Sequence, residues 1–223
     1  PRGWIMSKVP LPPGARGNTF IGIAGLIGVG KSTLATKLGA HLDLPVHHEP
    51  VDDNVYLKDF YAETAKWAFA MQVYLLNRRF QQHQEIIWRG LGGVQDRTIY
   101  EDSIFAKVLR DSGLMHPRDY ETYLSLFHNL SHFMCRPTAI VYLDASPETS
   151  IERIQSRARG FETGITLDYL RNLQKEYEVF VEDISRIIPV IRVSWEQFGD
   201  TEAIADAITR EVERARYLRD IKL

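Results

Sequence analysis

Residues 25–32 read Gly-Leu-Ile-Gly-Val-Gly-Lys-Ser and decide the fold of this 223-residue chain. They match the phosphate-binding loop pattern G-x-x-x-x-G-K-[ST] at every specified position. Glycines allow the backbone to curl until successive N–H groups point at a polyphosphate. The lysine adds a charge for the β- and γ-phosphates, and the serine offers a hydroxyl to Mg²⁺. The predicted phosphate-binding residues of this segment are Gly25, Gly28, Gly30, Lys31, Ser32 and Thr33.

The flanks of this loop have the context that the motif requires. Residues 20–24, Phe-Ile-Gly-Ile-Ala, form a short apolar run that is typical of a buried strand. Residues 32–42 carry leucines at positions 34, 38 and 42, which share one stripe of a helix. Such a helix directs the positive end of its dipole at the phosphates. This context argues against a chance match in a glycine-rich turn, so the chain is predicted to bind a nucleoside triphosphate.

The composition disfavours several classes of protein. A formal net charge of -2 and a pI near 6.4 do not favour nucleic acid or an anionic membrane as the main partner. No apolar run approaches the ~20 residues of a membrane span. Residues 1–18 lack the apolar core of a signal peptide and are expected to form a flexible arm. Cys135 is the single cysteine, so we expect no intrachain disulfide, a reducing, cytoplasmic location and a buried apolar role for its side chain.

Five short apolar runs alternate with helical segments. This alternation predicts a single α/β domain over residues 19–223, with a five-stranded parallel sheet covered by helices on both faces. Residues 51–59 are expected to form a polar connection. The predicted strands are 20–24, 44–49, 93–97, 138–143 and 189–193. The predicted helices are 32–42, 63–89, 99–110, 117–133, 147–156, 167–188 and a last helix that starts at residue 200 or 201.

Polar residues follow two of these strands, at the sheet edge where parallel sheets bind their ligands. Glu49 ends the second strand, and a carboxylate there can take the proton of a substrate hydroxyl that attacks a γ-phosphate. Asp96 and Arg97 end the third strand, where the arginine can stabilise charge on the transferring phosphoryl group. Asp96 can hold that arginine or contact Mg²⁺. The alternatives are a solvated glutamate and a surface ion pair of little energetic value.

Gln72 and Arg79 lie seven residues apart on the long helix predicted for 63–89. Seven steps of about 100° bring both side chains to the same face of the helix. Leu75 and Leu76 share that face, and long polar side chains among apolar neighbours need partners. The edge of a nucleobase would supply them, because Gln and Arg both offer paired hydrogen-bonding groups. The alternative is an exposed edge of the helix.

Three arginines gather near Gly160, at the end of the predicted helix 147–156. Like charges this close repel one another unless an anion lies between them. A lid over residues 157–165 that closes these arginines over a triphosphate would explain the cluster and would exclude water. The alternative is a solvated basic end of a helix. The residues are Arg153, Arg157 and Arg159.

Two other patterns do not indicate a functional site. His128 and His132 have the spacing of metal ligands on a helix, but zinc needs three or four ligands and no third is evident. The chain also lacks the N-K-x-D motif that reads guanine in GTPases.

Taken together, these residues resemble the deoxyribonucleoside kinase family over about residues 19–210. Residues 49–51 resemble the family's E-P-V segment, and residues 96–102 resemble its [ED]-R-S-x-Y-x-D segment. The three arginines followed by Glu162 resemble its lid. The eleven-residue spacing from Tyr61 to Gln72 resembles that between the family's sugar-binding tyrosine and base-reading glutamine. The resemblance departs from the animal members at Asp96, where they usually carry Glu, and at the E-P-V tryptophan position, which holds no Trp.

The resemblance implies a P-loop kinase fold and a role for each matched residue. Glu49 is implied as the general base, Arg97 and Lys31 as catalytic cations, and Ser32 with Asp96 as the Mg²⁺ site. Phe198 and Arg157 are expected to sandwich the adenine of the donor. The residues implied in nucleoside binding are Glu49, Tyr61, Gln72, Arg79 paired with Asp102, Phe105 and Glu162.

The expected reaction is transfer of the γ-phosphate of ATP, with Mg²⁺, to the 5′-hydroxyl of a deoxyribonucleoside. An Arg79–Asp102 pair presents a donor beside an acceptor, which suits deoxyadenosine, deoxyguanosine or deoxycytidine and disfavours thymidine. The resemblance favours purines and implies a homodimer through helices equivalent to 64–89 and 117–133. Two alternatives stay open, a nucleoside monophosphate kinase of the thymidylate type and a non-catalytic nucleotide-binding subunit.

Overall fold

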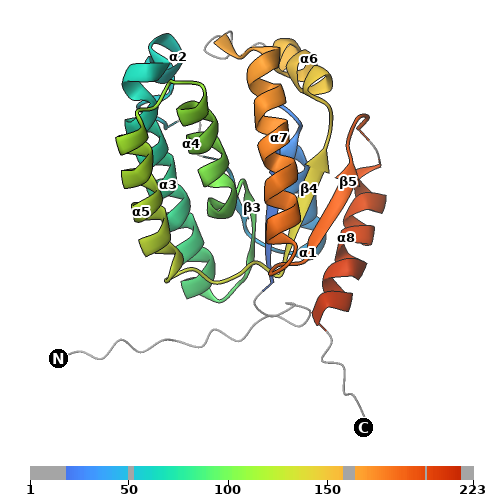
Figure 1. Cartoon of the computed structure of the whole chain (residues 1–223). Coiled ribbons are helices and arrows are strands. Elements are labelled where there is room, and N and C mark those ends of the chain that lie inside the picture. Colours follow the sequence, from blue (N-terminus) through green and yellow to red (C-terminus); the bar gives the residue numbers. More distant parts are fainter. Residues whose placement is uncertain (1–18, 50–52, 158–163, 199, 217–223) are drawn as a thin grey trace, which may run out of the picture.

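The computed structural model describes residues 19–49, 53–157, 164–198 and 200–216. Five parallel strands form one sheet in the order β2-β3-β1-β4-β5 (Figure 1). The prediction of an α/β fold with a five-stranded parallel sheet is therefore confirmed. The strands are β1 (Phe20–Gly25), β2 (Val46–His47), β3 (Gly93–Asp96), β4 (Ala139–Asp144) and β5 (Val190–Ser194).

Helices cover both faces of this sheet. Ile21 and Ile23 of β1 share a buried core with Leu34 of α1 and with residues of α8. Ala24 belongs to a second core on the opposite face, with Leu173 of α7 and residues of α4 and α6. Side chains along β1 therefore alternate between two cores, as the period of two in a strand requires. The helices are α1 (Lys31–Leu42), α2 (Leu57–Ala62), α3 (Thr64–Arg89), α4 (Asp102–Asp111) after the 3₁₀ helix η1 (Ile99–Glu101), α5 (Pro117–Ser131), α6 (Pro147–Arg157), α7 (Leu167–Ile184) and α8 (Thr201–Arg216).

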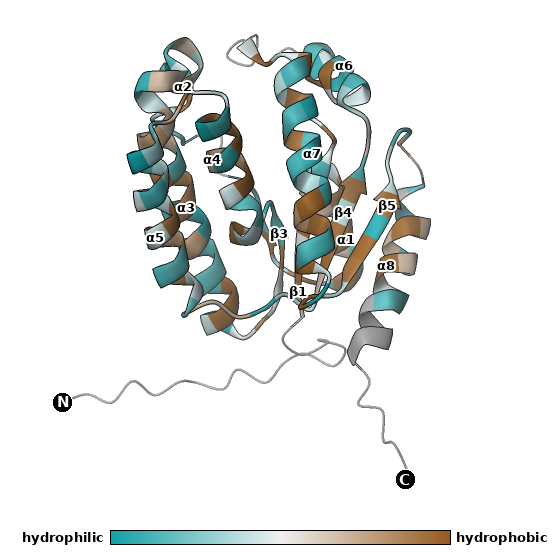
Figure 2. Ribbon diagram, viewed as in Figure 1, coloured by the Kyte–Doolittle hydropathy of each residue, from teal (hydrophilic) through white to brown (hydrophobic). Residues whose placement is uncertain are grey.

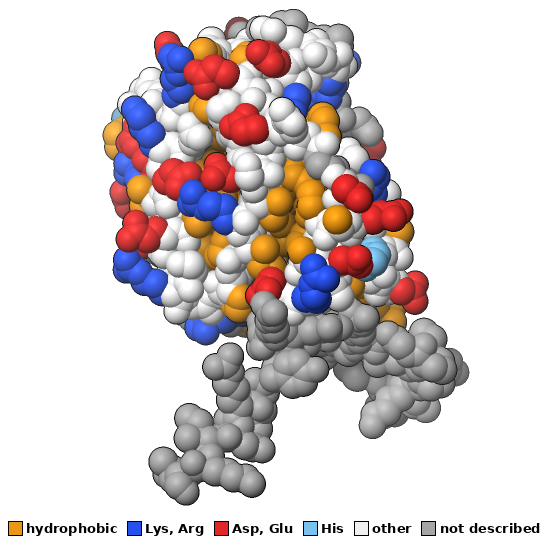
Figure 3. Space-filling view, turned by 90° about the vertical axis from the view of Figure 1, so that its right-hand side faces the viewer, with side chains coloured by type: hydrophobic (Ala, Val, Ile, Leu, Met, Phe, Trp, Pro, Cys, Tyr) orange, Lys and Arg blue, Asp and Glu red, His pale blue; other side chains and the backbone are white. Residues whose placement is uncertain are grey.

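A third core joins helices α2 to α5, which stand together on one side of the molecule in Figure 1. Leu76 of α3, Ala106 of α4 and Tyr123 of α5 are buried in it. In Figure 2 the helices show alternating brown and teal bands, as amphipathic helices do. Figure 3 views the side that carries β5 and α8, where a strip of hydrophobic side chains lies among charges of both signs.

Several predicted boundaries differ from the structure; the helix predicted for 167–188, for example, ends at Ile184. Part of the predicted polar connection 51–59 is helical, because α2 runs over Leu57–Ala62 and buries Phe60 against α3. The strand predicted for 44–49 is shorter, since only Val46 and His47 pair with β3. Pro45 has no N–H to donate, although its carbonyl accepts a hydrogen bond from Val94 N (2.8 Å).

The expectation of a buried cysteine was wrong. Cys135 is exposed and lies in the irregular segment between α5 and β4. Its backbone is held there, because its N–H donates to His83 Nε2 (2.9 Å) and its carbonyl accepts from the Tyr100 hydroxyl (3.1 Å). Among the described residues, no helix combines the length and the apolar composition that a bilayer-spanning segment requires.

Candidate active site

A cavity of about 790 Å³ opens beside the loop that follows β1. Its walls come from this loop, the end of β2, α2, α3, α4 and α6, so segments far apart in the sequence meet around it. Fourteen of the predicted site residues line it, and three others, Gly25, Asp96 and Asp102, are not among its lining residues. The lining residues that were predicted are Gly28, Gly30, Lys31, Ser32, Thr33, Glu49, Tyr61, Gln72, Arg79, Arg97, Phe105, Arg153, Arg157 and Phe198.

The loop Gly25–Ser32 depends on glycine conformations. Gly28 has φ +80°, and a Cβ on it would come within 2.5 Å of Ile154 Cγ1 and 3.1 Å of the Ser150 carbonyl oxygen. Gly30 has φ +106° and precedes the first residue of α1. Larger side chains would strain the backbone at both positions and would collide with α6 at Gly28. The loop is therefore packed closely enough to α6 to fix its curvature.

Lys31 turns its ammonium back into this loop. Its Nζ donates to the carbonyl oxygens of Gly25 (3.1 Å) and Leu26 (2.7 Å). Burial, reinforced by the nearby Arg97 charge, lowers the pKa of Lys31 to about 8. An anion in the cavity would stabilise the charged form of this lysine, because carbonyl dipoles compensate an ammonium only in part.

Ser32 and Asp96 meet beneath the loop. The Ser32 hydroxyl donates to Asp96 Oδ2. Asp96 Oδ1 is buried and has no hydrogen-bond partner among the described residues. The unpartnered carboxylate oxygen of Asp96 and the hydroxyl of Ser32 together form a pair of ligands that suits Mg²⁺, because this ion prefers hard oxygen ligands.

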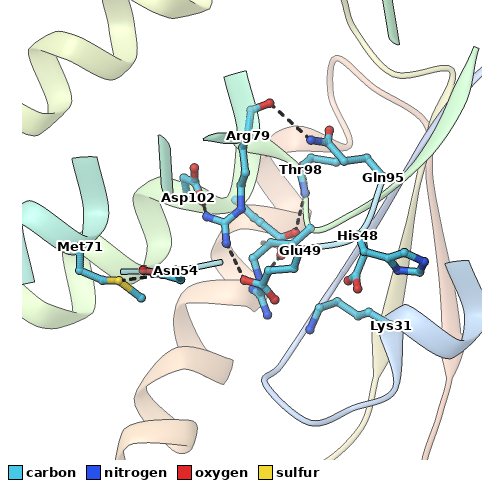
Figure 4. Close-up of polar contacts among 12 residues, drawn as sticks. Lys31, His48, Glu49, Asn54, Met71, Arg79, Gln95, Thr98 and Asp102 are labelled. Carbon is cyan, nitrogen blue, oxygen red and sulfur yellow. Dashed lines mark hydrogen bonds and ion pairs between the residues drawn. The ribbon is translucent and has the colours of Figure 1, made fainter. Parts of the chain in front are cut away.

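Glu49 follows β2 by two residues and lies between two arginines, of which Figure 4 shows Arg79. Its Oε1 is 2.6 Å from Arg79 Nη2 and 3.1 Å from Arg97 Nε. Burial alone would raise the pKa of Glu49, but Arg97, Arg79 and Lys31 outweigh burial and hold the pKa at about 2. The carboxylate is therefore ionised throughout the physiological range, and a quarter of its side chain remains exposed to the cavity.

Arg97 is held by more than Glu49. Among the described residues, Asp43 and Arg97 are the only residues other than glycine with a positive φ, which is 67° at Arg97. Its Nη1 donates to the Tyr177 hydroxyl (2.6 Å), and its guanidinium lies over the Phe105 ring, 4.6 Å from the centroid. The Tyr177 hydroxyl in turn donates to Glu101 Oε2 (2.5 Å). A backbone conformation of this kind, locked by several partners, is typical of functional sites.

The predicted pairing of Arg79 with Asp102 is present. Arg79 Nη1 donates to Asp102 Oδ1, while Nη2 of the same guanidinium reaches Glu49. Arg79 and Asp102 are 2% and 1% exposed, so water screens this pair little. Gln72 is also buried and lines the cavity from the same face of α3. The alternative of an exposed helix edge is therefore excluded for Gln72 and Arg79.

Arg153 of α6 contacts two other segments of the chain. Arg153 Nη1 donates to the Val29 carbonyl (3.0 Å), and its Nη2 donates to the carbonyls of Trp195 (2.9 Å) and Glu196 (3.0 Å). Its guanidinium also stacks on the Phe198 ring, 4.1 Å from the centroid. Arg153 thus ties the phosphate loop to the segment after β5.

Arg153 therefore covers one face of the Phe198 ring, and the sandwich of adenine between Phe198 and Arg157 stays a prediction. Arg157 is exposed and lines the cavity. Arg159 and Glu162, two further predicted residues, lie outside the described residues.

The comparison with known proteins agrees with this geometry. A family model described as deoxynucleoside kinase matches residues 21–215. The chain belongs to the deoxynucleoside kinase family. Over 203 residues it is 56% identical to the deoxyadenosine kinase of Dictyostelium discoideum, covering 91% of this chain and 83% of that protein. Over 184 residues it is 37% identical to the deoxyadenosine/deoxycytidine kinase of Bacillus subtilis, covering 81% of this chain and 84% of that protein.

A solved deoxynucleoside kinase has the same fold. The structure of deoxyadenosine kinase from M. mycoides with products dCMP and a flexible dCDP bound superposes with a TM-score of 0.79 at 31% identity. The match covers 88% of this chain and 100% of that chain. The P-loop kinase fold expected from the resemblance is therefore confirmed.

Several residues of this deoxynucleoside kinase site were missed by the sequence analysis. Asn54 and Met71 both line the cavity, and Asn54 Nδ2 donates to Met71 Sδ (3.4 Å), a contact that Figure 4 shows. The apolar lining carries no motif at all. The missed lining residues are Ile27, His48, Asn54, Leu57, Phe60, Met71, Leu75, Ser156 and Tyr169.

The histidine pair at the end of α5 lies on the surface of the molecule. His128 and His132 are exposed at the end of α5, and no group of three or more potential ligands forms among the residues that the structure describes.

Proposed function

We propose that this kinase transfers the γ-phosphate of ATP, bound as its Mg²⁺ complex, to the 5′-hydroxyl of a purine deoxyribonucleoside, with deoxyadenosine preferred. The observation that carries the proposal is the position of Glu49. On one side of Glu49, in the same cavity, lie Arg97 and Lys31 at the phosphate loop. On its other side lies the Arg79–Asp102 pair of α3 and α4. Donor and acceptor halves of a phosphoryl-transfer site thus meet at one carboxylate.

In this proposal the chain acts by positioning groups and stabilising charge. Ser32 and Asp96 hold Mg²⁺, which neutralises charge on the phosphates when bound. Lys31 and Arg97 face the charge that develops on the transferring phosphoryl group. When Arg97 donates to that group, its hold on Glu49 weakens and the pKa of Glu49 rises from about 2. Glu49 then accepts the proton of the 5′-hydroxyl more readily.

The preference for a base with an exocyclic amine beside a ring nitrogen follows from the Arg79–Asp102 pair. Asp102 accepts from an exocyclic amine, and Arg79 donates to the ring nitrogen beside it. Adenine and cytosine share this arrangement, whereas thymine would place a carbonyl against Asp102. Relatives named deoxyadenosine kinase and deoxyadenosine/deoxycytidine kinase are consistent with this preference.

Separate assays with a nucleoside and a nucleotide acceptor test the proposal. ATP and Mg²⁺ are offered with deoxyadenosine, with dAMP or with thymidylate, and ADP formation is followed. We expect turnover with deoxyadenosine, because Glu49 would repel the phosphate of a nucleotide acceptor. Faster turnover with a nucleotide would support a nucleoside monophosphate kinase, and no acceptor-dependent turnover would support a non-catalytic subunit.

We further propose that the kinase is a cytoplasmic homodimer that pairs through α3 and α5. Large apolar side chains are exposed at the ends of these helices, among them Trp88 and Phe133, each 74% exposed. Light scattering after gel filtration is expected to give twice the 25.6 kDa chain mass. The change Trp88→Asp should yield monomers, while the matched control Val179→Asp on α7 should not. A monomeric wild-type protein would contradict the proposal.

A further inference from the structure

Tyr177 has no part in the proposed reaction so far, yet it is a partner of Arg97, one of the two arginines that contact Glu49. It lies on α7, its side chain is fully buried, and its hydroxyl is 2.6 Å from Arg97 Nη1. The same hydroxyl donates to Glu101 Oε2 (2.5 Å). The phenol therefore accepts from a guanidinium and donates to a carboxylate at once.

These hydrogen bonds belong to a closed network that begins and ends at the turn carrying Arg97. Glu101 Oε1 accepts from the backbone N–H of Thr98 (3.0 Å), the residue that follows Arg97 in the chain. Glu101 Oε2 also lies 3.5 Å from Arg97 Nη1. The network thus runs from Arg97 through Tyr177 and Glu101 back to the turn that carries Arg97. These hydrogen bonds link the turn that carries Arg97 to α7, whose Tyr177 is buried in the second core. The backbone of that turn has φ 67° at Arg97.

The surroundings hold the phenol in one orientation and in one protonation state. The Tyr177 ring stacks on Tyr142 of β4, with centroids 5.9 Å apart, and meets the edge of Phe105, which also lies against Arg97. Burial raises the pKa of Tyr177 well above its usual range, although Arg97 opposes this effect. The hydroxyl therefore keeps its proton and remains a donor to Glu101.

We propose that Tyr177, acting with Glu101, is a positioning residue that aims the Arg97 guanidinium between Glu49 and the transferring phosphoryl group. Arg97 Nη1 is occupied by Tyr177, so Nε and Nη2 face Glu49 and the Gly25 carbonyl at the mouth of the phosphate loop. Without the phenol hydroxyl the guanidinium is free to rotate toward Glu101, and it loses its alignment with the reacting atoms. This inference rests on the proposed kinase reaction and adds a residue that acts through Arg97.

The test replaces Tyr177 by phenylalanine, which removes the hydroxyl and keeps the packed ring. We expect Tyr177→Phe to lower kcat by about 10- to 100-fold, the size expected for one hydrogen bond to a charged group. KM for ATP and for deoxyadenosine should stay within about threefold, because Arg97 is aimed at the transition state. The matched control is Tyr142→Phe, which removes the hydroxyl of the ring stacked on Tyr177 and leaves the Tyr177 hydroxyl on Arg97. Its kcat should stay within about twofold of wild type.

Repeating the Tyr177→Phe change in an Arg97→Lys enzyme distinguishes an effect on the aim of Arg97 from a general loss of packing. In an Arg97→Lys enzyme, Tyr177→Phe should change kcat by less than about twofold, since the group that it aims is gone. An equal loss in both backgrounds, a similar loss in Tyr142→Phe, or a wild-type kcat in Tyr177→Phe would overturn the inference. If Tyr177→Phe does not fold, Glu101→Gln takes its place with the same expected loss and the same refutation by a wild-type kcat. Wild-type enzyme inactive on every deoxynucleoside would refute the proposed function instead.

Discussion

Replacing Glu49 by glutamine tests the carboxylate on which the proposed reaction depends. The change keeps the shape of the side chain and one carbonyl-type oxygen, but it removes the negative charge and the proton acceptor. In the structure that charge faces Arg79 Nη2 at 2.6 Å and Arg97 Nε at 3.1 Å. General base catalysis contributes about 10²- to 10⁴-fold to rates. We therefore expect Glu49→Gln to lower kcat at least about 100-fold, which equals about 2.7 kcal/mol in the barrier.

The same change has a second, independent consequence for stability. The pKa of Glu49 falls from 4.5 to about 2 on folding, which corresponds to about 3 kcal/mol of stabilisation by the two arginines and Lys31. Because the pKa is depressed in the folded state, this stabilisation is present above about pH 4.5. It is lost as the pH falls toward 2. The difference in unfolding free energy between wild type and Glu49→Gln should thus shrink on the acid side.

Steady-state kinetics and urea unfolding at pH 7 and pH 3 measure both effects. The matched control is Glu63→Gln, since Glu63 pairs with Lys66 on the surface and should change neither quantity measurably. A kcat within tenfold of wild type would refute the role of Glu49 as base. A stability difference that does not depend on pH would refute the electrostatic account of its environment.

Three further predictions concern the base reader, the loop and the lysine. Replacing Arg79 and Asp102 together by apolar residues should shift the preference toward thymidine, and unchanged ratios of kcat/KM would argue against this pair as the base reader. Gly28→Ala should abolish ATP binding and lower stability by about 1–3 kcal/mol, since a Cβ would lie 2.5 Å from an α6 side chain at φ +80°. Gly113→Ala, at φ +70° with no described atom within 4 Å, is its control in calorimetry. Because burial lowers the pKa of Lys31 to about 8, the free enzyme loses this charge as the pH rises, so kcat/KM for ATP should fall above about pH 8. A profile that stays flat to pH 9.5 would contradict that assignment.

The parts of the site that could be predicted have local signals. Residues 25–32 carry their chemistry in one contiguous pattern, and Glu49 follows a strand, where parallel sheets bind ligands. The Arg79–Asp102 contact joins residues 23 positions apart, and only the family resemblance indicated it. Helix α2 was missed because six residues with one buried phenylalanine make too weak a periodic signal.

Residues that act through tertiary contacts could not be predicted. Tyr177 has an ordinary place on the buried face of an amphipathic helix, and its contact with Glu101 spans 76 residues. Glu101 itself has the pattern of a capping box with Thr98, which conceals its second role. The guanidinium of Arg153 donates to three backbone carbonyls that the sequence pattern did not indicate, and its role as a phosphate ligand stays a prediction. A charge pattern does not encode which acceptor a long side chain reaches.

A panel of the four deoxyribonucleosides, assayed with ATP and Mg²⁺ and with ATP alone, tests the central claim most directly. We expect ATP turnover that depends on the nucleoside, with the highest kcat/KM for deoxyadenosine and the lowest for thymidine. A highest kcat/KM for thymidine, or ADP formation equal with and without nucleoside, would contradict the account.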